Sequence, residues 1–357
     1  MRIDVRQICF IMFAYTAATK LLMYPTILSQ LCGRDLLFSA ATSFLIEGIA
    51  VWTVAYLCSR TDKTFFQLLQ GTLGNVGARI IFGFFAVFFF LAAIIPVFEQ
   101  EQYVHNIFYD TIPSIGVFLP FFIFAAYAAG KRLTNIGRCA DICFPIFLVS
   151  IVFLLAMAFP EVQWDDFLPV LKTPATKILR GVLGTALNFF EPCWLLMFMG
   201  RFKYKKGDAA RITFSYAGGA AAVLLFLTVF YGMYGAVATS RTFAVARMSL
   251  FFPAIETLGR IDIILLLALE IVMLFAVVLN IQLATQCISD CAGWDNLKII
   301  SVIVNTAMLL ILVFTESIYN SIHLVYYKWA WIAVIIFTVL IPILAWALKR
   351  RNTNEKQ

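Results

Sequence analysis

The architecture of this chain is set by one segment near its start, Ala14-Tyr15-Thr16-Ala17-Ala18-Thr19-Lys20-Leu21-Leu22-Met23-Tyr24-Pro25. The segment lies inside an apolar run, yet small and polar residues occupy its middle and a proline follows them. Proline has no backbone N–H and is best tolerated in the first turn of a helix, so Pro25 favours a second half-helix that starts there. We therefore predict that the first membrane span is interrupted near residues 18–24.

A matching interruption is predicted in a later apolar run, which contains Leu187-Asn188-Phe189-Phe190-Glu191-Pro192-Cys193-Trp194. Pro192 again suits the start of a half-helix. If this run is the sixth span, both interruptions fall in the first span of a five-span half. That is the arrangement of inverted-repeat transporters, which bind a solute near the bilayer midplane. Ordinary proline kinks without a site are the alternative. We predict that residues 18–24 and 188–192 face one another.

The composition is that of a membrane protein. The chain has 357 residues, of which 62% are hydrophobic and 13% are charged, and its mean hydropathy is +0.91. In soluble domains about a quarter of the residues are charged. Apolar runs of about twenty residues, long enough to cross a bilayer, recur along the chain without the alternation of β-barrel strands. Lipid tolerates only helices or closed barrels, so these runs predict helices.

We therefore predict an all-α polytopic membrane protein with about ten transmembrane helices, in a five-plus-five inverted-repeat transporter-like fold whose helices 1 and 6 are broken. A single transmembrane domain is expected over 1–357, with repeat one at about 7–159, repeat two at about 179–348 and a short polar tail at 352–357. Apolar side chains at helical spacing in 59–75 predict an additional interfacial helix. The predicted spans are 7–31, 36–58, 76–98, 114–130, 139–159, 179–200, 209–236, 261–289, 297–314 and 329–348.

The net charge of +7 is concentrated in alternate loops. With the N-terminus in the cytoplasm, the cytoplasmic segments hold more than twice as many Lys and Arg residues as the outer segments, which is the positive-inside bias. This bias predicts that both termini are cytoplasmic. It also makes the basic runs topology signals and neighbours of membrane lipid, and we expect no nucleic-acid partner. No cleavage-site pattern follows the first apolar run, so that run is expected to remain as a span.

Two ionisable residues stand at the predicted breaks, Lys20 and Glu191. A charge in the middle of a span costs about 3 kcal/mol on insertion scales, so such groups need partners or water. Lys20 would lie at the negative C-terminal end of one half-helix and Glu191 at the positive N-terminal end of another. We predict that they face a shared cavity and pair with each other or with the two ends of a zwitterion; a purely structural ion pair is the alternative. The predicted ligand-binding residues are Thr16, Thr19, Lys20, Asn188 and Glu191.

Further polar residues inside spans suggest a possible ion or proton pathway through Glu47, Glu270 and Asn280. Asn280 continues a polar stripe that begins at Glu270 in the eighth span. For Glu47, a packing hydrogen bond to a neighbouring helix is an equally good interpretation. The sequence Glu-Gln-Glu-Gln at 99–102 could form an outer gate, although a solvated end of the third span is favoured.

Residues for catalysis, for metal binding or for a cofactor are not evident. The sequence has two histidines and none of the motifs of metalloproteases, serine hydrolases or phosphate-binding loops. The pairs Cys139-x3-Cys143 and Cys287-x3-Cys291 lack a usual zinc spacing. We predict that the protein is not an enzyme and has no catalytic residues, no metal and no cofactor.

Short motifs follow one another in order along nearly the whole chain: Arg6-Gln7, Tyr24-Pro25, Gly33-Arg34-Asp35, Phe167-Leu168-Pro169-Val170-Leu171, Phe190-Glu191, Phe252-Pro253 and Arg260-Ile261-Asp262. Together they resemble the B subunit of spore germinant receptors, the GerAB-type proteins of the amino acid–polyamine–organocation transporter superfamily. There are two departures. Leu36-Leu37 follow the glycine motif where the family often has a tryptophan nearby, and Glu270 stands where an aromatic or apolar residue is expected.

The resemblance implies a five-plus-five transporter-like protein in the inner membrane of the spore. It would bind a small-molecule nutrient such as an amino acid, and its partners would be a membrane-bound A subunit and a C-subunit lipoprotein. The leading hypothesis is therefore a nutrient sensor that signals by changing conformation. The alternative is a proton- or cation-coupled amino acid permease, and the residues around the site could be the same in both.

Overall fold

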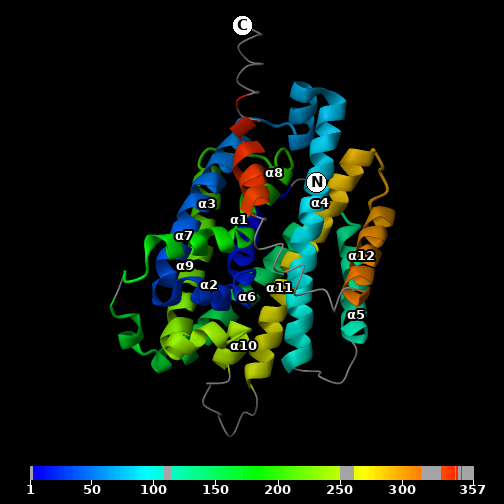
Figure 1. Ribbon diagram of the computed structural model, residues 1–357. Coiled ribbons are helices and arrows are strands. Elements are labelled where there is room, and N and C mark those ends of the chain that lie inside the picture. Colours follow the sequence, from blue (N-terminus) through cyan, green and yellow to red (C-terminus); the bar gives the residue numbers. More distant parts are fainter. Residues whose placement is uncertain are drawn as a thin grey trace.

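The computed structural model describes residues 3–107, 114–169, 171–249, 261–314, 331–341, 343, 344 and 347. Over these ranges the protein is helical, and the only strand-like pairing is an isolated bridge between Ile3 and Phe202. The long helices pack side by side in one bundle (Figure 1). The predicted all-α polytopic fold is confirmed.

The first span consists of two half-helices, as predicted. Helix α1 (Val5–Ala18) begins at a capping box, in which the Asp4 carboxylate accepts from the Arg6 amide and Gln7 Oε1 accepts from the Asp4 amide. After Ala18 the chain leaves the helix, and α2 (Tyr24–Cys32) begins with Pro25 in its first turn. Helix α2 ends at Gly33, whose φ of 59° lies in the region that favours glycine.

The sixth span is broken in the same way. Helix α7 (Ala175–Gly184) is followed by a short 3-10 turn, Ala186–Asn188, and then by α8 (Glu191–Met197), which has Pro192 in its first turn. Both predicted interruptions are therefore present. After each of them the chain enters a new helix with the predicted proline in its first turn.

The remaining helices follow the predicted spans closely. These helices are α3 (Leu36–Ser59), α4 (Phe65–Ile107), α5 (Ser114–Ala129), α6 (Leu133–Ala158), α9 (Asp208–Tyr234), α10 (Ala244–Ser249), α11 (Ile261–Ala292), α12 (Leu297–Phe314) and the apolar helix Trp331–Leu340. In α4, Gly74 has a φ of 75° and a ψ of 175°, so residues 65–73 form a separate short helix where the interfacial helix was predicted.

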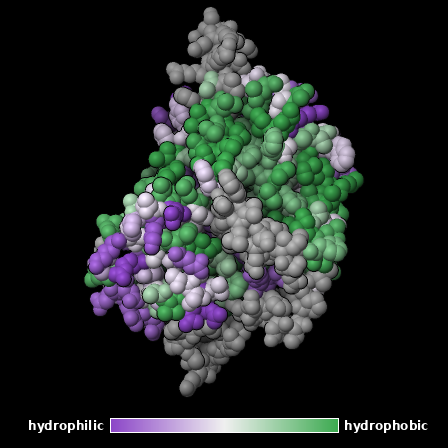
Figure 2. Space-filling view, viewed as in Figure 1, coloured by the Kyte–Doolittle hydropathy of each residue, from purple (hydrophilic) through white to green (hydrophobic). Residues whose placement is uncertain are grey.

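Six helical stretches in the described ranges are long and apolar enough to cross a membrane, and three shorter apolar helices accompany them. The predicted count of about ten is higher because α1, the two halves of the sixth span, Phe118–Ala129 and Trp331–Leu340 are each too short to be counted on their own. Large apolar side chains cover much of the outer surface. In the view of Figure 2, the hydrophilic residues gather mainly at the lower left.

One end of the bundle gathers segments that the charge count assigns to the cytoplasm. The Arg6 guanidinium is 3.2 Å from Asp141 Oδ1 near the start of α6, and the Ile3 amide donates to the carbonyl of Arg201. Arg201 in turn approaches Asp290 near the end of α11 at 3.9 Å. These contacts place the start of α1 on the same face as the loops that follow α8 and α11.

The opposite end is held by the buried carboxylate of Asp35, which is 1% exposed. Its two oxygens accept from the amides of Leu171 and Thr173, each at 2.8 Å. Next to it, Arg34 Nη1 donates to the carbonyl of Leu168 at 2.7 Å. The loop after α2 and the segment between α6 and α7 are thereby joined into one outer brace, defined here as Arg34, Asp35 and residues 168, 169 and 171–173.

Some predictions lie outside the described residues. These are the tail 352–357, the orientation of the C-terminus, the motif Phe252-Pro253 and Arg260, and parts of the last span, 329–348. The boundaries of the two repeats stay a prediction.

We expect Asp35→Ala to destabilise the protein by about 3 kcal/mol, because two backbone amides lose a charged acceptor. The exposed Asp165, in the same outer segment, provides the matched control, and Asp165→Ala should change stability by less than about 0.5 kcal/mol. The free energy of unfolding in detergent measures both. Equal effects of the two substitutions would contradict the role assigned to the outer brace.

The topology can be tested with an impermeant thiol reagent on intact cells. Cysteine introduced at Lys172, in the outer brace, should react, whereas cysteine introduced at Lys205, in the loop after α8, should react only after the membrane is opened. Both positions are exposed in the folded protein. Labelling of the Lys205 position in intact cells would reverse the predicted orientation.

Candidate functional site

The two broken helices meet at an ion pair. Lys20 Nζ lies 2.6 Å from Glu191 Oε1, and both side chains are completely buried. Lys20 follows the end of α1, and Glu191 is the first residue of α8. The second carboxylate oxygen of Glu191 accepts from the Phe190 amide at 3.0 Å, at the positive end of the α8 backbone dipole. The ends of two half-helices are thus joined by opposite charges.

A second carboxyl group joins this pair from α3. Glu47 Oε1 accepts from the backbone amide of Glu191 at 3.0 Å, and Glu47 Oε2 accepts from the Tyr216 hydroxyl at 2.8 Å. The Glu47 side chain therefore links α3 to α8 and, through Tyr216, to α9. One lysine serves a cluster with two carboxyl groups, and we refer to Lys20, Glu47, Glu191 and Tyr216 as the central cluster.

Aromatic rings shield the cation of the central cluster. The centroid of the Phe189 ring lies 4.8 Å from Lys20 Nζ, and that of the Phe44 ring lies 5.8 Å away. Contacts of this kind attract a cation through the negative face of the ring. They also exclude water, so the electrostatic interactions inside the cluster are stronger than they would be at a surface.

A small cavity, with both apolar and polar residues in its walls, lies beside the break in the first span. Its volume is about 20 Å³, and its walls come from the end of α1 and residues 19–22, from α4 and from α11. A cavity of this size holds about one water molecule. Its lining residues are Ala18, Thr19, Leu22, Pro96, Glu99, Gln100, Met273, Ala276, Val277 and Asn280.

Hydrogen bonds connect this cavity to the surrounding helices. Tyr15 donates its hydroxyl proton to Asn280 Oδ1 at 3.0 Å, and Asn280 Nδ2 donates to the carbonyl of Ala92 at 3.1 Å. The Tyr15 ring also packs edge-on against Phe190, which precedes Glu191. The cavity and the central cluster are therefore linked through Tyr15 and through the neighbours Thr19 and Lys20.

Glu270, on α11, contacts a residue that lines the cavity. The carboxamide of Gln100 lies against the Glu270 carboxylate, and with its nitrogen on that side it donates to both oxygens. Gln100 therefore contacts the half-buried acid and also lines the cavity. This arrangement gives Glu270, on α11, a polar neighbour on α4.

The predicted site residues thus fall into several groups. Lys20, Glu191 and Glu47 form the central cluster, while Thr19 and Asn280 line the small cavity. Thr16 packs against Gly219 of α9: a Cβ added at Gly219 would lie 3.1 Å from the Cβ of Thr16. Asn188 donates from its side chain to the carbonyl of Thr185, within its own break.

Sequence reasoning missed Tyr216 and undervalued the segment 99–102. A lone tyrosine beside the small residues 217–222 of a span was the available signal for Tyr216. Gln100 and Glu101 are 2% and 6% exposed, so this part of α4 is buried and the interpretation as a solvated helix end is wrong for them.

Replacing Lys20 by alanine should destabilise the protein by about 3–5 kcal/mol, because Glu191 is left as a buried acid without its cation. The double change Lys20→Ala with Glu191→Gln should be less destabilising than the single change, since it removes both charges. Unfolding of the purified variants in detergent gives the coupling energy. The ion pair between the exposed Arg6 and Asp141 provides a control, and Arg6→Ala should lower the free energy of unfolding by no more than about 1 kcal/mol. A double variant as unstable as the sum of the single variants would show that the pair is not coupled.

Comparisons with known proteins agree with this architecture. A family model described as "Spore germination protein", Spore_permease, matches residues 2–321. A solved structure of Mhp1 in an inward-facing conformation is similar in fold, with a TM-score of 0.56 and 13% sequence identity; the match covers 91% of this chain and 74% of Mhp1. No protein with a curated description gives a significant match. The likeness to Mhp1 agrees with the predicted transporter-like fold, and the match to the family model extends over most of the chain. The chain therefore belongs to the Spore_permease family of spore germination proteins.

Proposed function

We propose that this protein is the nutrient-sensing B subunit of a spore germinant receptor and that it binds a small polar nutrient, most simply an amino acid, between the two broken helices. One observation carries the proposal. In a chain of a spore germination family, both interruptions meet at a buried ion pair, beside a small cavity to which Thr19, Gln100 and Asn280 contribute polar groups. Free backbone groups and opposite charges together are what a zwitterion needs in the middle of a bilayer.

The chemistry of the site suits an amino acid. A zwitterion carries an ammonium and a carboxylate, and the central cluster holds the complementary carboxylate of Glu191 and ammonium of Lys20. The amide and carboxyl groups of Gln100, Asn280 and Glu99 add hydrogen-bonding partners at the cavity. The ligand would take over contacts that the two charges now make with each other.

The cavity of about 20 Å³ is too small for any amino acid. Ligand binding therefore requires residues 19–22 to separate from α4 and α11. A ligand shifts a conformational equilibrium only if it binds one state more tightly than the other. A site that must open to accept its ligand meets this condition, because the cavity beside residues 19–22 has no room for the ligand while it is closed. Ligand occupancy would then reach partner subunits as a change in helix positions.

The setting follows from the family. We propose that the protein lies in the inner membrane of the spore, with both termini cytoplasmic, and that its signal passes to a membrane-bound A subunit and a C-subunit lipoprotein. Ligand-binding roles are proposed for Thr19, Lys20 and Glu191, with Thr16 and Asn188 as neighbours in the two broken spans. Glu47, Glu270 and Asn280 are proposed to respond to the opening of the site.

A permease that couples amino acid entry to a proton or cation is the second candidate. The observation in its favour is that two acids lie within long apolar helices, Glu47 buried and Glu270 half-buried against Gln100, since such acids often mark proton or ion pathways. The purified protein alone in vesicles distinguishes the two functions. Accumulation of labelled amino acid would support the permease, whereas a sensor should bind the amino acid without transporting it.

Removal of the cavity hydroxyl in Thr19→Val should raise the nutrient concentration for half-maximal germination by about tenfold, the worth of one hydrogen bond. Thr213→Val in α9, outside the cavity, is the matched control and should leave the response unchanged. Lys20→Ala with Glu191→Gln should abolish the response. The readout is the germination of spores that contain equal amounts of each variant. A parental response in the charge-free double variant would place the ligand elsewhere.

A further inference from the structure

A long groove lies on the outer surface between α5 and α12, away from the central cluster. Its volume is about 550 Å³, within the range of about 300–1,000 Å³ that is usual for ligand pockets. Its walls are mostly apolar, and several of them face outward: Leu119 is 43% exposed, Ile123 is 65% exposed and Val302 is 54% exposed. In a membrane these side chains meet lipid chains, so the groove is open to the bilayer.

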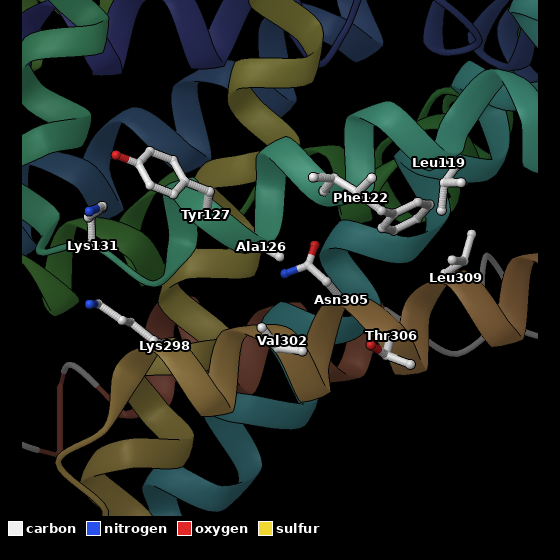
Figure 3. A pocket seen from close by; sticks show the side chains of 11 residues that line it. Leu119, Phe122, Ala126, Tyr127, Lys131, Lys298, Val302, Asn305, Thr306 and Leu309 are labelled. Atoms are coloured by element: carbon white, nitrogen blue, oxygen red, sulfur yellow. The ribbon is translucent and has the colours of Figure 1, made fainter.

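Two lysines stand together at one end of the groove. Lys131 follows α5 and Lys298 lies in the first turn of α12, and Figure 3 shows both side chains at the same end, with Leu119 and Leu309 at the other. Among the described residues neither lysine forms an ion pair with an acid. Lys131 Nζ lies 4.3 Å from the centroid of the Tyr127 ring. The groove therefore has an apolar body and a cationic end.

The depth of the lysines matches that of lipid phosphates. Tyr127 is 66% exposed and Trp294, just before α12, is 58% exposed, and both residue types are enriched at the membrane–water interface. The charge count assigns this end of the bundle to the cytoplasmic face. From the lysines the groove runs along α12 toward the interior of the bilayer, past Val302 and Leu309.

A second groove, of about 510 Å³, runs along the other side of α5 and shares Tyr127 and Lys131 with the first. Its remaining walls come from α5, α6 and α11, with Phe124, Ile271 and Phe275 among them. Two apolar grooves therefore begin at one cationic point, Lys131. A molecule with one anionic head and two apolar tails has this shape.

We propose that α5 holds one anionic phospholipid of the cytoplasmic leaflet, with its phosphate on Lys131 and Lys298, one acyl chain between α5 and α12, and the other between α5 and α6. Charge complementarity favours a lipid over a helix of a partner protein. Two lysines at headgroup depth, without an ion pair to any acid in the described ranges, would need acidic residues on a partner helix, whereas an anionic lipid brings its charge to that level.

The test uses the full-length protein in detergent, titrated with phosphatidylglycerol or with phosphatidylcholine of the same acyl chains and followed by native mass spectrometry. Phosphatidylglycerol should bind more tightly. Each lysine should contribute about fivefold, the equivalent of about 1 kcal/mol, so Lys131→Gln with Lys298→Gln should weaken phosphatidylglycerol binding by about 25-fold and remove the preference. Val302→Trp should fill the first groove and weaken the binding of both lipids.

Lys203→Gln with Lys205→Gln is the matched control, because it removes the same charge from exposed positions in the loop after α8. It should retain the preference for phosphatidylglycerol. Equal losses in the control and the test variants would mean that the lipid responds only to net charge, and unchanged binding in the test variants would leave the groove without a lipid; either result overturns the proposal. It is also overturned if Val302→Trp leaves lipid binding intact but prevents copurification of other receptor subunits, because the groove would then hold a protein helix.

Discussion

The ion pair between Lys20 and Glu191 is the constraint on which the rest of the structure depends. Neither charge is tolerated alone in the middle of a bilayer, so the two breaks that carry them have to meet. Once they meet, the end of α1 lies beside the start of α8, and Glu47 and Tyr216 tie α3 and α9 to the same point. A buried ion pair contributes little net stability compared with an apolar contact of the same volume. Its value here is to fix which parts of the chain face each other.

At both ends of the bundle, polar side chains also join segments that are distant in the sequence. The motif Gly33-Arg34-Asp35 and the segment 167–171 are far apart in the sequence, yet they form one structural unit, because Asp35 and Arg34 bind the backbone of that segment. At the other end, Gln7 donates to Asp141 at 2.8 Å. Two of the motifs that resemble the family, Arg6-Gln7 and Gly33-Arg34-Asp35, thus attach the broken first span to neighbouring parts of the chain.

Much of this architecture could be predicted from the sequence, because apolar length and proline position are local properties. The breaks at 19–23 and 185–190 are present where Pro25 and Pro192 indicated them, and the ion pair followed from opposite charges at opposite helix ends. The surroundings of the pair were not predictable in the same way. Whether Glu47 meets Tyr216, or Gln100 meets Glu270, depends on the rotation of each helix about its axis, and a nearly uniform apolar sequence specifies that rotation poorly. The burial of Gln100 and Glu101 was missed because a cluster of polar residues at a helix end usually indicates solvent.

The small volume of the cavity beside residues 19–22 affects the ligand concentration to which the proposed receptor responds. When only a fraction of the molecules is open, the apparent dissociation constant equals the intrinsic constant divided by that fraction. A protein that is open one time in a hundred therefore needs about a hundredfold more ligand than the contacts alone would require. A tightly closed site, with room for about one water, thereby acts as a concentration threshold. For a dormant cell, such a threshold separates a trace of nutrient from a supply that can sustain growth.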